Sequence, residues 1–255
     1  MESHVRRMPP VCGVLLLLLC LLVSAFPAAA AEMTVSAAAS LTNAFTELAA
    51  LFEKKHAGLT VHVNFAASNP LLRQLQEGAP VDVFASADQA TMDKAVAAGV
   101  VTPASRRNFA RNDLVLVAPK AATVPAGLGD LGNCRKIALG NPESVPAGRY
   151  AREALTTAGL WDVLHPKYIF GNSVRQVLDY VARGEVDAGF VYRTDALQFA
   201  DKVDVIMNAE GHEPVSYPIA VATTGSNAVM GQTFLDFVLS PEGQAVLAGY
   251  GFSGP

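Results

Sequence analysis

The residues best suited to bind a ligand lie at four junctions where an expected strand leads into an expected helix. The segments read AAASLTNAF (37–45), FAASNP (65–70), ESVPAGRY (143–150) and GNSVRQ (171–176), and the residues at the turn of each junction are uncharged. In open α/β sheets, ligands bind beyond the carboxyl ends of the strands, where helices begin. A helix start offers unpaired N–H groups and the positive end of the helix dipole, which together bind an anion without lysine or arginine. The four junctions therefore predict an anion-binding site, although Ser and Asn also cap many helices that bind nothing.

Helix-start preferences give each junction residue an expected position. Ser68 precedes a helix marked by Pro70, and Pro146 and Ala147 open another, because proline is favoured in the first helical turn. Asn172 is the expected N-cap of the fourth helix, which puts Val174 in its first turn.

The sequence shows no recognisable catalytic or metal site. We interpret Asp82 as a strand-end residue bonded to a neighbouring loop and Asp88 as a helix N-cap, rather than as an acid–base pair. Neither a G-x-S-x-G nucleophile elbow nor a P-loop occurs. The histidines at 56, 62, 165 and 212 lack metal-ligand spacing. We therefore expect a binding protein and not an enzyme.

Strand and helix patterns alternate along the chain and predict an α/β fold with doubly wound, parallel sheets. Expected strands include MTVSAA, LTVHVNFAA, VDVFAS, LVLVAP, KIALG, KYIFG, VDAGFVY, VDVIM and YPIAVA. Expected helices run from Leu41 to near Gly58, from near Pro70 to Gly78, from Asp88 to about Ala98, over about 147–158, from Ser173 to Arg183, from Thr194 to Phe199, from Ala228 to Leu239 and from Pro241 to Ala248.

This order predicts two lobes joined by chain crossings near 111–114 and 217–222. We assign residues 32–112 and 220–255 to the first lobe and residues 113–219 to the second. The two helices at the end of the chain return to the first lobe in this assignment.

Residues 1–31 have the features of a cleaved signal peptide. Arg6 and Arg7 precede an apolar run over 11–26, and the alanines that follow offer cleavage after Ala30 or Ala31. A retained membrane anchor is the alternative, but the run is short for a spanning helix. We expect export to the periplasm.

The remaining chain is acidic and holds a single cysteine. The leader contains two of the 19 basic and one of the 23 acidic residues, so the mature net charge is −5. This charge gives no reason to expect a nucleic-acid partner or an anionic membrane. Because only Cys134 remains, no intrachain disulfide is expected.

Several longer segments carry a family resemblance over essentially the whole mature chain. They are AAASLTNAF, FAASNPLLRQL, GAPVDVFASADQATMDKA, DLVLVAPK, NPESVPAGRYAREAL and VYRTDAL. In these segments the sequence resembles the molybdate-binding proteins of bacterial ABC importers. The resemblance implies a two-lobed periplasmic binding protein fold (type II, venus flytrap), each lobe a mainly parallel sheet with helices on both faces. It also implies a monomer that meets membrane permease subunits, with the ATPase a separate chain.

The same resemblance implies which residues bind the ligand. The serine hydroxyls of the family fall on Ser40 and Ser68, two backbone N–H donors fall on Ala147 and Val174, and a closing tyrosine hydroxyl falls on Tyr192. The molybdenum would then be held only as its oxyanion, with no direct protein ligand and no cofactor.

The chemistry of these residues agrees with an oxyanion ligand but leaves its identity open. All five positions can donate hydrogen bonds, and none is a carboxylate. Such a pocket favours fully deprotonated dianions over phosphate, which keeps a proton near neutral pH. Molybdate or tungstate is what the resemblance implies. A receptor for sulfate or thiosulfate is the alternative, and a transferase on the same frame is a weaker one.

Overall fold

The computed structural model describes residue 2, residues 31–123 and residues 125–255. The predicted signal peptide lies outside the described residues except for residue 2 and Ala31. Ala31 is the first residue of strand β1 (Ala31–Ala38), and its N–H donates to the carbonyl of Gly58 at 2.9 Å.

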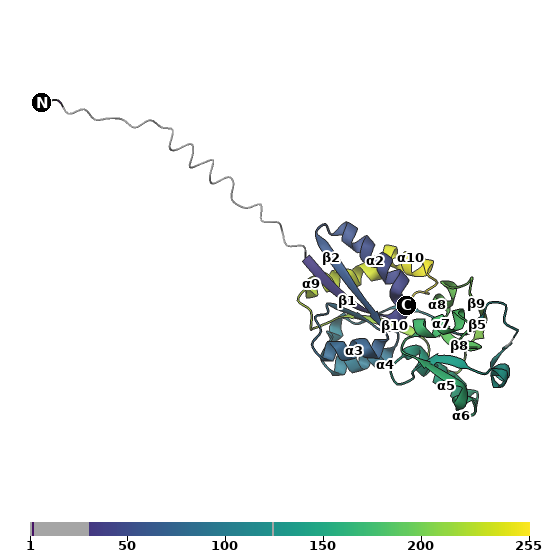
Figure 1. Ribbon diagram of the computed structural model, residues 1–255. Coiled ribbons are helices and arrows are strands. Elements are labelled where there is room, and N and C mark those ends of the chain that lie inside the picture. Colours follow the sequence, from purple (N-terminus) through teal and green to yellow (C-terminus); the bar gives the residue numbers. More distant parts are fainter. Residues whose placement is uncertain (1, 3–30, 124) are drawn as a thin grey trace. The chain divides into compact units, whose positions relative to one another are not determined.

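The first lobe is built on a sheet with strand order β2-β1-β3-β10-β4 (Figure 1). Its other strands are β2 (Leu59–Ala66), β3 (Val83–Ala85), β4 (Arg107–Arg111) and β10 (Ser216–Val221). Its helices are α2 (Thr42–Lys55), α3 (Ser68–Gln76), α4 (Gln89–Ala97), α9 (Ala228–Leu239) and α10 (Pro241–Gly249). Strand β1 runs parallel to β2 and β3, whereas β10 runs antiparallel to β3 and β4.

The second lobe repeats this plan on a sheet with strand order β7-β6-β8-β5-β9. The strands are β5 (Leu114–Pro119), β6 (Ile137–Gly140), β7 (Tyr168–Gly171), β8 (Ala188–Tyr192) and β9 (Val203–Asn208). The helices are α5 (Pro146–Thr157), α6 (Trp161–Leu164), α7 (Val174–Ala182) and α8 (Arg193–Leu197). Here β6 is parallel to β7 and β8, and β5 is antiparallel to β8 and β9.

Helices cover both faces of the first sheet, as the alternation of strand β3 shows. Val83 and Ala85 belong to the hydrophobic cluster that includes Phe45 of α2 and Phe234 of α9. Phe84, between them, belongs to a second cluster with Leu71 of α3 and Met92 of α4. Because successive side chains of a strand point to opposite faces, the two clusters lie on opposite sides of the sheet.

The two-lobed α/β fold is thus as predicted, but the sheets are mixed rather than mainly parallel. In each sheet only two of the four strand pairings are parallel. Strands β5 and β10 enter their sheets directly from the other lobe. They therefore run away from the interlobe side, opposite to the strands whose carboxyl ends lie there.

The second predicted lobe boundary also needs correction. Residue 220 falls inside strand β10, which pairs with β3 and β4 of the first lobe. The return to the first lobe therefore lies between Asn208 and Ser216. The predicted boundary at 219/220 instead cuts through the apolar run YPIAVA. The first crossing joins β4 to β5 at Asn112 and Asp113, as expected.

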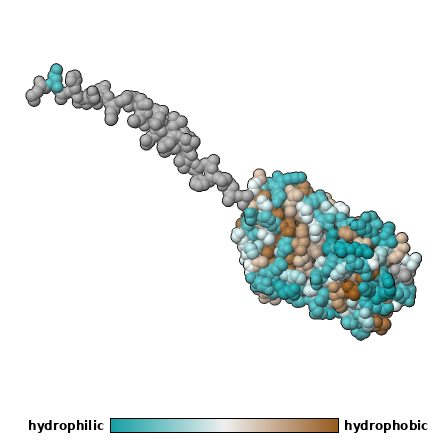
Figure 2. Space-filling view, viewed as in Figure 1, coloured by the Kyte–Doolittle hydropathy of each residue, from teal (hydrophilic) through white to brown (hydrophobic). Residues whose placement is uncertain are grey.

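Polar side chains cover most of the face shown in Figure 2. The large apolar residues that the structure shows as exposed are Val163, Phe170, Leu197, Val205 and Val229. Within the described residues, no helix has both the length and the apolar character needed to cross a bilayer.

Candidate functional site

One small cavity lies where the helix starts of the two lobes meet. From the first lobe it is lined by Ala38, Ala39, Ser40, Ala67, Ser68 and Ala87, and from the second lobe by Val145, Pro146, Ala147, Val174 and Tyr192. All five residues predicted to bind a ligand are in this lining. None of the described lining residues carries a charge, so any charge on a ligand must be met by hydrogen bonds and dipoles.

Four of the lining residues lie at helix starts. Ser40 lies in the single 3₁₀ turn Ala39–Leu41 that leads into α2, and Ser68 is the first residue of α3. Ala147 is the second residue of α5, after Pro146, and Val174 is the first residue of α7. N–H groups in a first helical turn have no intrahelical acceptor and lie at the positive end of the helix dipole. The cavity is therefore suited to an anion.

Two glycines let helix α5 approach the end of strand β6. A Cβ on Gly148 would lie 1.9 Å from the carbonyl oxygen of Gly140, and a Cβ on Gly140 would lie 2.5 Å from Val145. Neither position therefore tolerates a side chain without a shift of the backbone. This close contact fixes where the first turn of α5, with the Ala147 N–H, reaches the cavity.

Both serine hydroxyls are buried and hydrogen-bonded. Ser68 is fully buried, and its Oγ accepts a hydrogen bond from the Ala87 N–H at 3.0 Å. Because a backbone N–H can only donate, the Ser68 hydroxyl proton stays free to donate elsewhere. The Ser40 Oγ lies 3.0 Å from the hydroxyl of Tyr217, a residue that the sequence did not indicate.

Tyr192 has a buried hydroxyl without a partner. It ends strand β8, and only 1% of its surface is exposed. Among the described residues, none forms a hydrogen bond with its hydroxyl. Burial, with a smaller contribution from Tyr217, raises the pKa of Tyr192 well above its ordinary value, so the phenol keeps its proton. Because a buried, unpaired hydroxyl is unfavourable, this O–H group is available to donate a hydrogen bond to a ligand.

Two ion pairs flank the cavity without lining it. Arg149 of α5 lies 2.5 Å from Asp88 of the first lobe, and Arg175 of α7 lies 2.6 Å from Asp195. Both carboxylates are fully buried. Each guanidinium is thus in direct contact with its carboxylate. These contacts neutralise the two arginines that closely follow the lining residues Ala147 and Val174 in the chain.

The nearby Arg175 only partly offsets the effect of burial on the pKa of Asp195. Burial raises this pKa to about 6, against the opposing effect of Arg175. For Arg149, the Asp88 carboxylate raises the pKa, although burial acts in the other direction. Arg149 therefore keeps its charge at neutral pH.

The structural roles predicted for the two aspartates are confirmed. Asp88 is the N-cap of α4 and accepts from the Thr91 N–H at 2.7 Å. Asp82 accepts from the N–H of Thr34 at 2.8 Å and from that of Asn227, before α9, at 2.7 Å. Within the described part of the chain, no cluster of His, Cys, Asp or Glu could hold a metal ion.

The predicted N-cap of α7 is wrong by one residue. Ser173, not Asn172, is the cap, and its Oγ accepts from the Gln176 N–H at 3.2 Å. The Gln176 side chain in turn accepts from the Asn172 N–H at 2.6 Å. The Ser-x-x-Gln spacing is that of a capping box, although Gln176 reaches the N–H of the residue before the cap rather than that of the cap itself.

Comparison with known proteins identifies the family. A model described as bacterial extracellular solute-binding protein matches residues 33–253. The molybdate-binding protein ModA of Escherichia coli (strain K12) is 41% identical over 230 residues, which cover 87% of this chain and 89% of that protein. A Bacillus subtilis (strain 168) protein, YvgL, named as a candidate ABC transporter substrate-binding lipoprotein, is 38% identical over 224 residues, covering 87% and 86%.

A solved structure agrees with these relatives in fold. The Azotobacter vinelandii periplasmic molybdate-binding protein superposes with a TM-score of 0.77 at 29% identity, covering 88% of this chain and 100% of that chain. The fold is therefore that of a two-lobed periplasmic binding protein. With the family model and the relatives over most of its length, the chain belongs to the bacterial extracellular solute-binding proteins, which bind solutes and are not enzymes.

Proposed function

We propose that this chain is an extracytoplasmic receptor that binds molybdate or tungstate between its two lobes. The observation that carries this proposal is the interlobe cavity lined by Ser40, Ser68, Ala147, Val174 and Tyr192. These residues supply hydroxyl and backbone N–H donors from both lobes. The unpaired, buried hydroxyl of Tyr192 is the donor that most clearly needs a ligand.

The donor set determines which ligands fit. A buried dianion is stable only when hydrogen bonds replace its water, and hydrogen bonds to charged acceptors are the strong ones. Monohydrogen phosphate carries a proton that needs an acceptor, and no carboxylate lines the described cavity. Molybdate, tungstate and sulfate present only acceptors at neutral pH. The cavity thus favours these three over phosphate.

The relatives support molybdate within this group. ModA proteins of Escherichia coli and Azotobacter vinelandii are named for molybdate binding, and this chain is similar to them over most of its length. Sulfate carries the same charge in a smaller tetrahedron. A receptor for sulfate or thiosulfate is therefore the second candidate.

Transport follows from the same proposal. The loaded receptor would dock on the permease subunits of an ABC importer, whose ATPase is a separate chain. YvgL, with 38% identity, is named for such a transporter. In this proposal residues 1–31 are removed as a signal peptide, and the mature monomer works in the periplasm.

Calorimetric titration of the purified protein with molybdate, tungstate, sulfate and phosphate tests the function. We expect tight binding of molybdate and tungstate with one site per chain, much weaker binding of sulfate, and no detectable binding of phosphate. Sulfate binding as tight as molybdate binding would assign the chain to the sulfate class instead. Absence of binding for all four anions would refute the proposal.

A further inference from the structure

We infer that Tyr217, held by Asn112, is a positioning residue that fixes Ser40 as a hydrogen-bond donor toward the cavity. The inference rests on the proposed function, since it assigns a role in binding the oxyanion to two residues outside the cavity lining. It follows from the directions of four hydrogen bonds that connect the first chain crossing to the ligand site.

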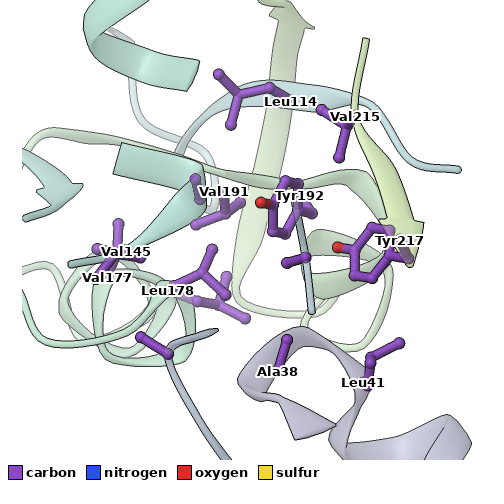
Figure 3. Packing of buried hydrophobic residues seen from close by; sticks show 14 of the residues in the cluster. Ala38, Leu41, Leu114, Val145, Val177, Leu178, Val191, Tyr192, Val215 and Tyr217 are labelled. Carbon is purple, nitrogen blue, oxygen red and sulfur yellow. The ribbon is translucent and has the colours of Figure 1, made fainter. Parts of the chain in front are cut away.

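Tyr217 is held rigidly behind Ser40. It lies on β10, just after the second chain crossing, and is fully buried. Its ring packs edge-on against Phe109, Phe252 and Tyr192, with ring centroids 6.1, 5.4 and 5.8 Å away. Figure 3 shows the rings of Tyr192 and Tyr217 beside each other, with both hydroxyls pointing to the same side. The packing leaves the Tyr217 hydroxyl little freedom to move.

The orientation of the Asn112 side chain is fixed by a backbone donor. Its Oδ1 lies 2.9 Å from the N–H of Asp113, and a backbone N–H can only donate. The other end of the amide must therefore be the NH₂ group. This group donates to Thr194 Oγ1 at 2.8 Å and to the Tyr217 hydroxyl at 3.3 Å.

The direction of the next bond follows from this assignment. Because the Tyr217 oxygen accepts from Asn112, and its buried proton has no acceptor other than Ser40 Oγ at 3.0 Å among the described residues, the Tyr217 hydroxyl is the donor of this bond. Burial, with a smaller contribution from Asp195, raises the pKa of Tyr217 well above its ordinary value, so this proton is present at neutral pH.

Ser40 is left with a proton for the cavity. Its Oγ accepts from Tyr217, and within the described residues the Ser40 hydroxyl has no further side-chain partner. Ser40 is itself part of the cavity lining. If Tyr217 instead accepted from Ser40, a lone pair of Ser40 would face the anion and repel it. The chain of bonds also polarises the Ser40 O–H, which strengthens it as a donor.

A double-mutant cycle in molybdate titrations tests this role. Tyr217→Phe keeps the ring and removes the donor, and we expect the molybdate affinity to fall about two- to tenfold, the range of one hydrogen bond between neutral groups. In a Ser40→Ala background, the same change should alter the affinity by less than about twofold, since no hydroxyl remains to be oriented. A merely structural role of Tyr217 would lower the affinity equally in both backgrounds.

Two further variants complete the test. Tyr250→Phe makes the same chemical change at a hydroxyl bonded to exposed Glu47 and should leave the affinity unchanged. Asn112→Ala removes the amide that sets the direction of the chain, so it should also weaken binding, and it replaces Tyr217→Phe if that variant does not fold. Unchanged affinity in both the Tyr217 and Asn112 variants, or equal losses with and without Ser40, overturns this role alone. A wild-type protein that binds no oxyanion overturns the proposed function with it.

Discussion

At the scale of single residues, the hydroxyls around the cavity are the side-chain hydrogen-bond donors of the candidate site. Ser40 and Ser68 each accept one hydrogen bond from the protein, which leaves their protons free for a ligand. The Tyr192 hydroxyl has no protein partner among the described residues. A hydroxyl that is buried but unpaired lowers the stability of the ligand-free protein, and an anion that accepts its proton removes that cost.

Tyr192→Phe tests this reading of the unpaired hydroxyl. The substitution keeps the ring but removes one donor to a charged acceptor, so the affinity for molybdate should fall roughly ten- to a hundredfold. The loss should lie mainly in the dissociation rate. The ligand-free protein should melt at the same temperature or slightly higher, because an unsatisfied polar group is removed. Calorimetry, stopped-flow dissociation and thermal melting measure these quantities.

Tyr168→Phe is the matched control for this change. Its hydroxyl donates to the carbonyl of Trp161 at 3.0 Å, away from the cavity lining. It should leave the molybdate affinity unchanged. If Tyr192→Phe also leaves both the affinity and the dissociation rate unchanged, Tyr192 is a structural aromatic residue and the proposed donor set is wrong at this position.

At the scale of elements, the site consists of helix starts held against strand ends. Helix α5 illustrates how closely they are held, since Gly148 packs directly on Gly140 at the end of β6. The N–H of Ala147, one residue before Gly148, depends on this contact for its position. The sequence contains both glycines, but only the fold reveals that they touch.

Gly148→Ala should therefore disturb stability and binding together. The new methyl group would meet the Gly140 carbonyl oxygen at 1.9 Å, so α5 must move away from β6. Overpacking of this kind costs about 1–3 kcal/mol of unfolding free energy. Molybdate affinity should also fall, because the Ala147 N–H moves with the helix. Denaturant unfolding and calorimetry give the two values.

The control for this variant is Gly129→Ala, where a Cβ would meet no atom within 4 Å. It should change neither the stability by more than about 0.5 kcal/mol nor the affinity. If Gly148→Ala behaves like this control, the close packing of α5 on β6 does not position the donor.

The elements differ in how well the sequence predicts them. Apolar periodicity and turn residues indicate the main helices, and proline at Pro146 and Pro241 marks two of their starts correctly. Strand β4, with the sequence RNFAR, was not predicted, because Phe109 and Ala110 are its only apolar residues and the others are polar or charged. The antiparallel direction of β5 and β10 was missed as well, since direction depends on which lobe the chain comes from.

At the scale of the whole molecule, contacts between distant segments complete the site. The family resemblance pointed to the five lining residues, because each lies in a short recognisable segment. It gave no indication of Tyr217, which lies 177 positions from Ser40. The pair between Arg149 and Asp88 was likewise missed, since sequence spacing does not indicate that the first helix of the second lobe meets a helix cap of the first lobe.

That interlobe pair also bears on how the charge of the ligand is met. Arg149 and Arg175 closely follow the lining residues Ala147 and Val174 in the chain, and each already faces a fully buried carboxylate. We therefore propose that neutral donors from both lobes, rather than an unpaired cation, hold a dianion in the cavity. This is the central claim about the molecule.

A crystal structure with bound tungstate tests this claim most directly, because anomalous scattering locates the tungsten atom without ambiguity. We predict one tungsten site per chain, inside the cavity, with the oxyanion within hydrogen-bonding distance of the Ser40, Ser68 and Tyr192 hydroxyls and of the Ala147 and Val174 N–H groups. A tungstate bound instead to Arg149 or Arg175, with either arginine separated from its aspartate, would contradict it.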